Sequence, residues 1–177
     1  MIDDLLAPGL KVVFCGTALS KTSYQQSAYY AHPGNKFYAV LFAEGFTDRQ
    51  LKPHEYKSLL TYGIGLTDVN KTEYGQDSEL SAERFDPGAV KQKILHYQPG
   101  FLAFTSKRAA QAFFGVKVLN YGEVRTRVGA INNDAADNDN IASGKTRFYV
   151  LPSTSGRASR YWDTGYWQRL SALISSP

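Results

Sequence analysis

The sequence predicts a three-layer α/β/α fold with a central, mainly parallel, four-stranded sheet. Short apolar runs rich in β-branched residues alternate along the chain with amphipathic helical segments, which is the pattern of a parallel sheet covered by helices. The 177 residues are the length of one domain, and 43% of them are hydrophobic, enough for an ordinary core. No internal repeat or low-complexity linker divides the chain, so residues 1–177 are expected to form a single domain.

Four segments are predicted to form the strands. Each is a short apolar run bounded by glycine, proline or polar turn residues. They are Lys11–Gly16, Gly63–Val69, Phe101–Thr105 and Phe148–Leu151. Parallel sheets of this kind bind ligands beyond the carboxyl ends of their strands. We therefore expect a site formed by the loop after Gly16, the Thr67–Asp68 end of the second strand and the turn after Leu151.

Helices are predicted from apolar spacing together with start and stop signals. Asn35 caps the first, which ends at Gly45, and Pro53 opens the second at the favoured first-turn position. Three more are expected over Pro87–Tyr97, Ser106–Gly115 and about Ser159–Ile174. The polar and aromatic segment Thr17–Gly34 is predicted to be a long loop, and loops of that length in compact domains are usually functional.

Composition and charge exclude several classes of protein. No apolar run approaches the roughly 20 residues of a membrane-spanning helix, and the acidic start Met1–Leu6 is unlike a secretory signal. A single cysteine, Cys15, can form neither an intramolecular disulfide nor a cysteine cluster. We expect a cytoplasmic, soluble monomer with no membrane partner. The net charge of +4, from 20 basic and 16 acidic residues, is a mild excess that is compatible with nucleic-acid binding.

Generic cofactor and metal motifs are missing from the sequence, so no cofactor and no metal are expected. Gly16–Ser20 has neither the glycine pattern of a dinucleotide site nor the end of a phosphate loop. His32, His54 and His96 have no metal-ligand spacing. The acidic stretch 133–140 resembles a calcium loop only in composition and is predicted to be a solvated hairpin.

Four segments resemble the mismatch-specific uracil/thymine DNA glycosylases of the uracil-DNA glycosylase superfamily. Asp4–Gly16 is similar to the start of that family, and Ala31–Phe37 to its His-Pro-x-Asn-Arg-Phe block. Gly45–Pro53 continues the match, and Val150–Gly156 resembles the wedge loop Leu-Pro-Asn-Pro-Ser-Gly. The resemblance implies a uracil-DNA glycosylase-like fold. It also implies cleavage, in DNA, of the bond between an altered base and its deoxyribose, after the base has left the stack.

The resemblance also implies a base pocket. Tyr30 occupies the position of the family's stacking aromatic, usually Phe, and stacking on a base is worth about 1–3 kcal/mol. The alternative is a tyrosine that merely packs on the sheet edge. The backbone of Gly16 and Thr17 is expected to approach the base, and Ser23 matches a family serine that lines the pocket.

The first motif departs from the family, because Ala18 stands where the family has the Asn that holds the attacking water. Asp68 is the leading replacement, since a carboxylate can stabilise an oxocarbenium-like state and orient water. It could instead accept a hydrogen bond from the base or cap a turn. Asn35 is a second catalytic candidate, although its position also suits a helix cap. Asn70 is a fallback, expected on the same strand face as Asp68.

Arg157 stands where the family has the Leu that enters the stack after the base has flipped. An arginine can fill that gap, stack, and bind phosphate or the orphaned guanine. With Ser153, Ser155, Gly156 and Arg160, it makes this loop the best DNA-contact candidate, against the alternative of a merely exposed basic turn.

The longer segment Gly122–Lys145, which carries Arg125 and Arg127, is expected to add a DNA-gripping hairpin.

Two other functions remain open at this point. The same fold could hold a lesion or its product without catalysis, with Ala18 as the mark of lost turnover. A nucleoside or nucleotide hydrolase acting on small molecules is disfavoured by the wedge loop and the basic balance. The sequence does not decide between uracil, thymine, hypoxanthine and an ethenobase, or between single-stranded and duplex DNA.

Overall fold

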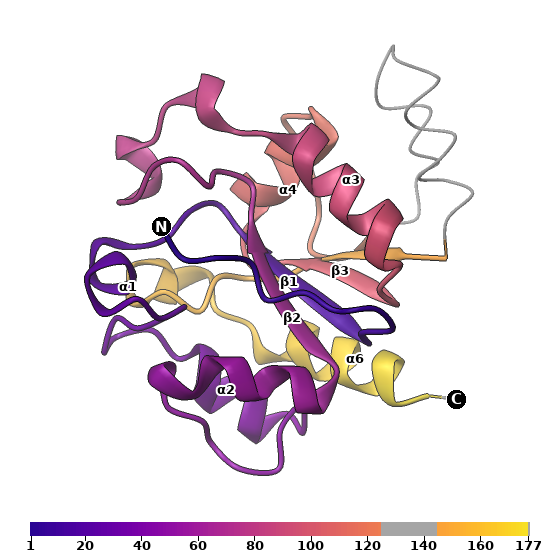
Figure 1. Ribbon diagram of the computed structural model, residues 1–177. Coiled ribbons are helices and arrows are strands. Elements are labelled where there is room, and N and C mark those ends of the chain that lie inside the picture. Colours follow the sequence, from indigo (N-terminus) through magenta and orange to yellow (C-terminus); the bar gives the residue numbers. More distant parts are fainter. Residues whose placement is uncertain (125–144, 177) are drawn as a thin grey trace.

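A computed structural model describes residues 1–124 and 145–176. Its centre is a five-stranded sheet in the order β2-β1-β3-β5-β4 (Figure 1). The strands are β1 (Val12–Gly16), β2 (Ile64–Asp68), β3 (Phe101–Phe104), β4 (Gly122–Val124) and β5 (Arg147–Val150).

The pairs β1–β2, β1–β3 and β3–β5 are parallel, which confirms the four predicted strands and their direction. The sheet has a fifth strand that the sequence pattern does not indicate. β4 pairs antiparallel with β5, has three residues and starts with a glycine in the left-handed region. A run this short shows no alternation from which a strand could be recognised.

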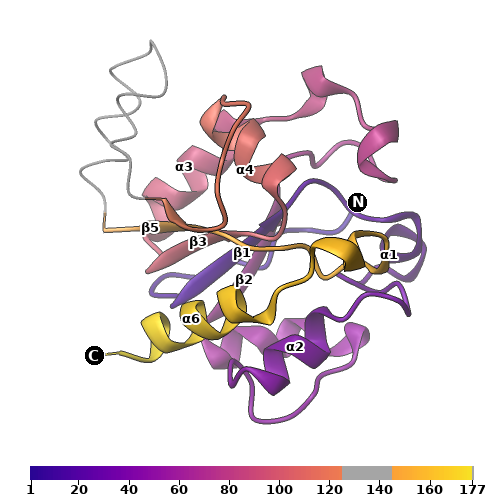
Figure 2. The same ribbon diagram turned by 180° about the vertical axis from the view of Figure 1, so that it is seen from behind.

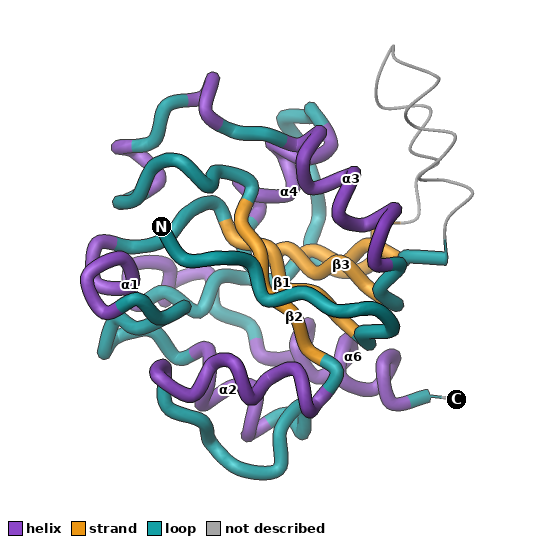
Figure 3. Tube along the Cα trace, viewed as in Figure 1, coloured by secondary structure: helices purple, strands orange, loops and turns teal. Residues whose placement is uncertain are grey.

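Helices cover both faces of the sheet, so the fold is the predicted α/β/α arrangement (Figures 2 and 3). α3 and α4 lie on one face, and α2 and α6 lie on the other. The α-helices are α1 (Lys21–Gln26), α2 (Phe37–Ala43), α3 (Pro87–Tyr97), α4 (Lys107–Phe114) and α6 (Thr164–Ser175). The 3₁₀ helices are η1 (Pro53–Tyr62), η2 (Asp77–Glu79), η3 (Ala82–Arg84) and η5 (Gly156–Tyr161).

Alternate side chains of β1 belong to two separate hydrophobic cores. Val12 and Phe14 face the α2–α6 layer, where Phe14 stacks on Trp167 with ring centroids 5.5 Å apart. Val13 and Cys15 face the α3–α4 layer, beside Phe104 and Phe113. All four β1 side chains are fully buried, so this strand is held on both faces and its carboxyl end has a fixed position.

Three details differ from the helix and loop predictions. The expected long loop contains α1, because the hydroxyl of Ser20 accepts a hydrogen bond from the Ser23 amide and caps six polar residues as a helix. The second predicted helix is a 3₁₀ helix, η1. The predicted last helix is two elements, since the chain is extended at Trp162 and Asp163 and the Asp163 side chain caps α6.

Arg125, Arg127 and the acidic stretch 133–140 lie outside the described residues. Within the described part of the chain, no helix is long and apolar enough to span a membrane.

Candidate active site

One cleft of 780 Å³ gathers the predicted site residues at the carboxyl edge of the sheet. It is lined by residues from the ends of β1, β2 and β3, from α1, and from the loops around residues 30–35, 75–78 and 153–158. Of the candidate residues in the described chain, the following line it: Gly16, Thr17, Ser23, Tyr30, Asn35, Asp68, Ser153, Ser155, Gly156 and Arg157. Arg160 does not. It is exposed, with its guanidinium 5.2 Å from the centre of the Tyr161 ring.

The cleft lies at the point where the strand order reverses. From β1 the chain passes to β2 on one side and then to β3 on the other. At such a switch point the connections diverge to opposite faces and leave a crevice beyond the strand ends, where α/β proteins bind ligands. The residues that meet there are Gly16, at the end of β1, and Thr105, directly after β3.

Three polar groups converge on the space above Gly16. A Cβ built on this glycine would lie 2.7 Å from Asp68 Oδ1, 3.5 Å from Thr105 Oγ1 and 3.6 Å from the Tyr30 hydroxyl oxygen. Any larger residue here would collide with the carboxylate. Gly16 thus lets the three groups come close together over the end of β1 at the floor of the cleft.

Asp68 is 4% exposed, and its Oδ2 has no hydrogen-bond partner among the described residues. Burial raises the pKa of Asp68 to about 7, and the negative charge of Asp4 adds to this effect. The positive charges of Lys71 and Lys93 and the Gly16 backbone act in the opposite direction. Leaving a buried carboxylate oxygen unpaired is costly. It is the state expected of a group that receives its partner from a ligand.

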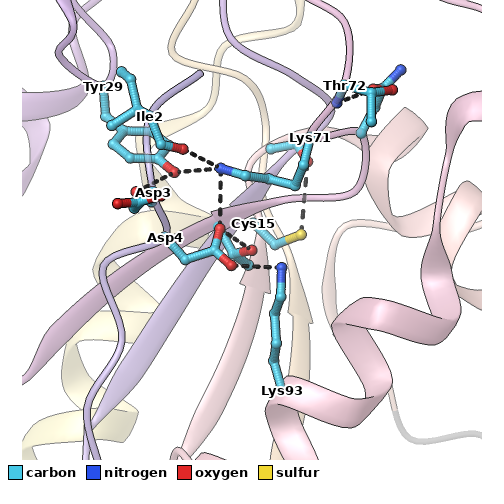
Figure 4. A network of polar contacts seen from close by, with 11 residues as sticks. Ile2, Asp3, Asp4, Cys15, Tyr29, Lys71, Thr72 and Lys93 are labelled. Carbon is cyan, nitrogen blue, oxygen red and sulfur yellow. Dashed lines mark hydrogen bonds and ion pairs between the residues drawn. The ribbon is translucent and has the colours of Figure 1, made fainter.

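The nearby Asp4 has the opposite environment (Figure 4). Its Oδ1 accepts a hydrogen bond from Thr67 at 2.8 Å and lies 3.1 Å from Lys71 Nζ, and its Oδ2 pairs with Lys93. Lys71 also donates to the Ile2 carbonyl and the Tyr29 hydroxyl, both at 2.9 Å. Burial would raise the pKa of Asp4, but the hydrogen bond from Lys93 and the charge of Lys71 outweigh it, so the pKa is lowered.

Tyr30 is held in one orientation at the side of the cleft. Its ring stacks on Phe37, with centroids 3.8 Å apart and planes inclined by 19°, and its hydroxyl lies 3.2 Å from Thr105 Oγ1. Its backbone φ of +54° falls in the left-handed region, which is strained for a tyrosine. Burial and the charge of Asp68 raise the pKa of Tyr30 well above its usual range, so the hydroxyl stays protonated.

Asn35 and Ser23 reach the cleft but also brace its walls. Asn35 Oδ1 accepts hydrogen bonds from the Phe37 amide at 3.0 Å and from Thr154 Oγ1 at 2.7 Å. Asn35 therefore forms the turn that leads into α2 and ties it to the loop after β5, but the N-cap residue of α2 is Lys36 and not Asn35 as expected. Ser23 Oγ, 2% exposed as a residue, accepts a hydrogen bond from the Ala31 amide at 3.1 Å and so holds the chain leading from Tyr30.

The structure contradicts the placement of Asn70 on a continuing strand. β2 ends at Asp68, and Asn70 turns inward with no exposed surface. Its Oδ1 accepts from the amides of Thr72 and Glu73, both at 3.0 Å, and its Nδ2 donates to the Glu73 carboxylate at 2.7 Å. An Asn shortly after a strand commonly makes such a turn, and that use consumes the amide that a water would need.

The loop after β5 forms one rim of the cleft. Ser155 Oγ accepts a hydrogen bond from the Arg157 amide at 3.3 Å and starts η5. The Arg157 side chain crosses to the opposite rim and donates to Gln76 Oε1 at 2.8 Å. Gly156 packs against the Gly34 backbone, where a Cβ would lie 3.2 Å from the Gly34 carbonyl oxygen. The two resemblance blocks, distant in sequence, are therefore in contact.

Among the cleft residues that the sequence did not single out are Thr105, Lys107 and Arg108. Lys107 lies at the start of α4 with its ammonium 4.4 Å from the centre of the Tyr121 ring. Arg108 packs over Phe85, and its buried Nε has no hydrogen-bond partner among the described residues. The end of β3 is part of the same carboxyl edge as Gly16 and Asp68, so the rule that located those two also indicates Thr105.

Within residues 1–124 and 145–176, no group of three or more His, Cys, Asp or Glu side chains is arranged to hold a metal ion. Cys15 is fully buried beneath the cleft, and burial raises the pKa of its thiol well above the usual value.

The domain is a doubly wound α/β fold. At its switch point lie a buried carboxylate, a fixed aromatic ring and a basic rim loop, which are the parts that a base-excising protein needs. The chain belongs to the Uracil DNA glycosylase superfamily, whose sequence model matches residues 4–173.

The fold is similar to the solution NMR structure of a protein from Methanosarcina acetivorans that is provisionally described as a uracil DNA glycosylase. The TM-score is 0.59 and the identity 19%, over 98% of this chain and 94% of that chain. At this identity the likeness shows the fold alone. Superfamily membership supports a DNA glycosylase role.

Proposed function

We propose that this protein is a monofunctional DNA glycosylase of the mismatch-specific type. It hydrolyses the N-glycosidic bond of uracil in DNA after the base has flipped out of the helix, and it leaves an abasic site. The observation that carries the proposal is the Asp68 carboxylate, buried at the floor of the cleft with one oxygen unpaired and with its pKa raised to about 7.

Asp68 can perform two tasks in this reaction. The C1′–N bond breaks with its electron pair leaving on the base, so positive charge develops on the sugar. An ionised carboxylate aimed at that charge stabilises it. As water attacks C1′, the same carboxylate takes its proton, and a base with a pKa near 7 is well matched to neutral solution.

Tyr30 supplies the stacking surface in this proposal. Phe37 covers one face of its ring, and Tyr30 lines the cleft, so a flipped base would extend the stack of the two rings. The aromatic pair is held before the base arrives, which avoids the entropic cost of ordering the ring on binding. The Gly16–Thr17 backbone lies beside this place and suits recognition of the base edge.

Arg157 is proposed to fill the gap that the flipped base leaves in the duplex. Its guanidinium is exposed and is held by a hydrogen bond to the neutral Gln76 amide, a partner that it can exchange for DNA without losing an ion pair. Ser153 and Ser155 lie on the same rim and can donate hydrogen bonds to phosphate. The protein is proposed to do this as a monomer.

A second candidate is a lesion-binding protein without turnover, which the alanine at position 18 favours. Single-turnover cleavage of a labelled duplex with one uracil opposite guanine separates the two. We expect the wild type to cleave, and Asp68→Asn and Asp68→Ala to bind the duplex but cleave it about 100-fold or more slowly. No cleavage by the wild type of uracil or hypoxanthine substrates, with lesion binding retained, would establish the binding protein instead.

A further inference from the structure

The proposed chemistry of Asp68 leaves two hydroxyl groups at the cleft floor without a role. Thr105 Oγ1 and the Tyr30 hydroxyl oxygen lie 3.2 Å apart, and together with Asp68 Oδ1 they are the three atoms nearest to the position of a Cβ on Gly16. Thr105 is 5% exposed and lies at the switch point, where the backbone bond from its amide to the Cys15 carbonyl, at 3.0 Å, fixes its position.

The hydrogen-bond inventory of this pair leaves acceptor capacity on both oxygens. Thr105 Oγ1 can donate its proton to the Cys15 carbonyl, a long contact of 3.5 Å, and the Tyr30 hydroxyl can donate to Thr105. A hydroxyl oxygen has two lone pairs, so the pair can still accept a hydrogen bond from a third group. The raised pKa of Tyr30 keeps its hydroxyl protonated and therefore keeps this arrangement in place.

An attacking water needs two acceptors and a free lone pair. Asp68 supplies one acceptor, but a single hydrogen bond does not set the direction of the water's lone pair. Ala18 has no polar side chain with which to supply the second. The hydroxyl pair lies within 3.6 Å, and the carboxylate within 2.7 Å, of the position that a Cβ on Gly16 would take, so the two acceptors are near enough to each other for one water to bridge them.

We propose that Thr105, supported by the Tyr30 hydroxyl, holds the attacking water against Asp68 and thereby does the work that an amide at position 18 would do. The inference rests on the proposed function. The water donates one hydrogen to Asp68 and the other to Thr105 Oγ1, which leaves a lone pair for C1′. As the C1′–O bond forms and the C1′–N bond breaks, Asp68 takes the first of these protons and the base leaves with the electron pair.

The test compares substitutions that keep the shape of the site and change only its hydroxyls. Thr105→Val removes the hydroxyl, Thr105→Ser restores it, and Tyr30→Phe keeps the stacking ring. Thr146→Val is the matched control, because Thr146 is a buried threonine whose hydroxyl donates to the Pro99 carbonyl at 2.6 Å, beyond the opposite ends of β3 and β5. Single-turnover cleavage and affinity for a uracil duplex are measured, with affinities taken in an Asp68→Asn background.

We expect Thr105→Val to cleave about 10- to 100-fold more slowly, the size expected for one hydrogen bond to a reacting group. Its affinity should be unchanged, and Thr105→Ser should recover the rate to within about threefold of wild type. Tyr30→Phe should lose about threefold to tenfold. Thr146→Val should lose stability but no rate. If Thr105→Val does not fold, the serine and phenylalanine variants still carry the comparison.

Three results would overturn the inference. The first is a wild-type rate in both Thr105→Val and Tyr30→Phe. The second is a failure of Thr105→Ser to recover the rate. The third is a fall in the affinity of Thr105→Val for the uracil duplex that is as large as its fall in rate. The third result would mean that the hydroxyl pair binds the base rather than the water. If the wild type and these variants all cleave at the same rate, only the inference about the hydroxyl pair is wrong. If the wild type is inactive, the proposed function is wrong as well.

Discussion

Asp4 and Asp68 both lie near the carboxyl end of β2, one half-buried and the other almost completely buried, and their surroundings differ. Asp4 has Lys71, Lys93 and Thr67 as partners, and its pKa is lowered. Asp68 has an oxygen without a hydrogen-bond partner in the described chain, and its pKa is raised to about 7. Burial alone therefore does not mark a functional carboxylate. An unmet hydrogen-bonding capacity in a residue that lines a cleft does.

The largest effect is expected when the charge of Asp68 is removed. Asp68→Asn should lower the single-turnover rate by about 100-fold or more, because it removes both the charge that stabilises the sugar cation and the base that accepts the proton.

The same substitution should not destabilise the fold at pH 8. The raised pKa means that the folded state binds more protons than the unfolded state between about pH 4 and pH 7, so Asp68 lowers stability as pH rises through that range. The amide removes this dependence. Thermal unfolding at pH 5 and pH 8 measures it, and a large loss of stability at pH 8 would make Asp68 a structural residue.

Asp4→Asn tests the other half of the comparison. It leaves Lys71 and Lys93, each partly buried, without their negative partner, and should lower the free energy of unfolding at pH 7 by roughly 1–3 kcal/mol. Because the pKa of Asp4 is lowered by folding, this stabilisation is present above the unfolded value near 4 and is lost as pH falls. Urea unfolding at pH 7 and pH 3 checks both statements.

Asp4→Asn should also leave cleavage at pH 8 close to wild type, since Asp68 is ionised there in both proteins. If folded Asp4→Asn loses as much cleavage rate as Asp68→Asn does, the two carboxylates do not differ in function as proposed.

The smallest effect is expected at the rim. Arg157→Ala should weaken binding to a uracil duplex severalfold and reduce the salt dependence of the affinity by about one counterion, if the guanidinium binds phosphate. Arg49→Ala is the control, because Arg49 is exposed, pairs with Glu55 at 3.1 Å and does not line the cleft. Equal affinities together with equal salt slopes for the two variants would contradict a DNA role for the rim arginine.

The parallel strands could be predicted because their apolar runs are buried on both faces and are bounded by clear breakers. α1 could not, because its six polar and aromatic residues have no apolar stripe, and only the cap at Ser20 marks it. The sequence marks the start of α6, since Asp163 is a typical N-cap residue. The apolar residues on both sides of it nevertheless suggested one continuous helix.

The site could be predicted where a residue type carries its own chemistry. Asp68 follows from the resemblance and from its position at a strand end, Tyr30 follows from the resemblance, and the structure places both in the cleft. Thr105 lies at a strand end that the same rule indicates, but its role could not be predicted, because that role depends on the Tyr30 hydroxyl 75 residues away in the sequence. Asn70 illustrates the converse, since only the structure shows that its amide is spent on a turn.

The most direct measurement of the central claim, that ionised Asp68 performs the chemistry, is the single-turnover rate of the wild type from pH 5 to pH 9 on a duplex with uracil opposite guanine. Asp68→Asn and Asp4→Asn are measured beside it. The wild-type rate is expected to fall about tenfold per pH unit below about pH 7 and to be level above it. Asp4→Asn should shift that profile to lower pH, because the charge of Asp4 raises the pKa of Asp68. A wild-type rate that is level from pH 5 to pH 8, or an Asp68→Asn rate equal to wild type, would contradict the account.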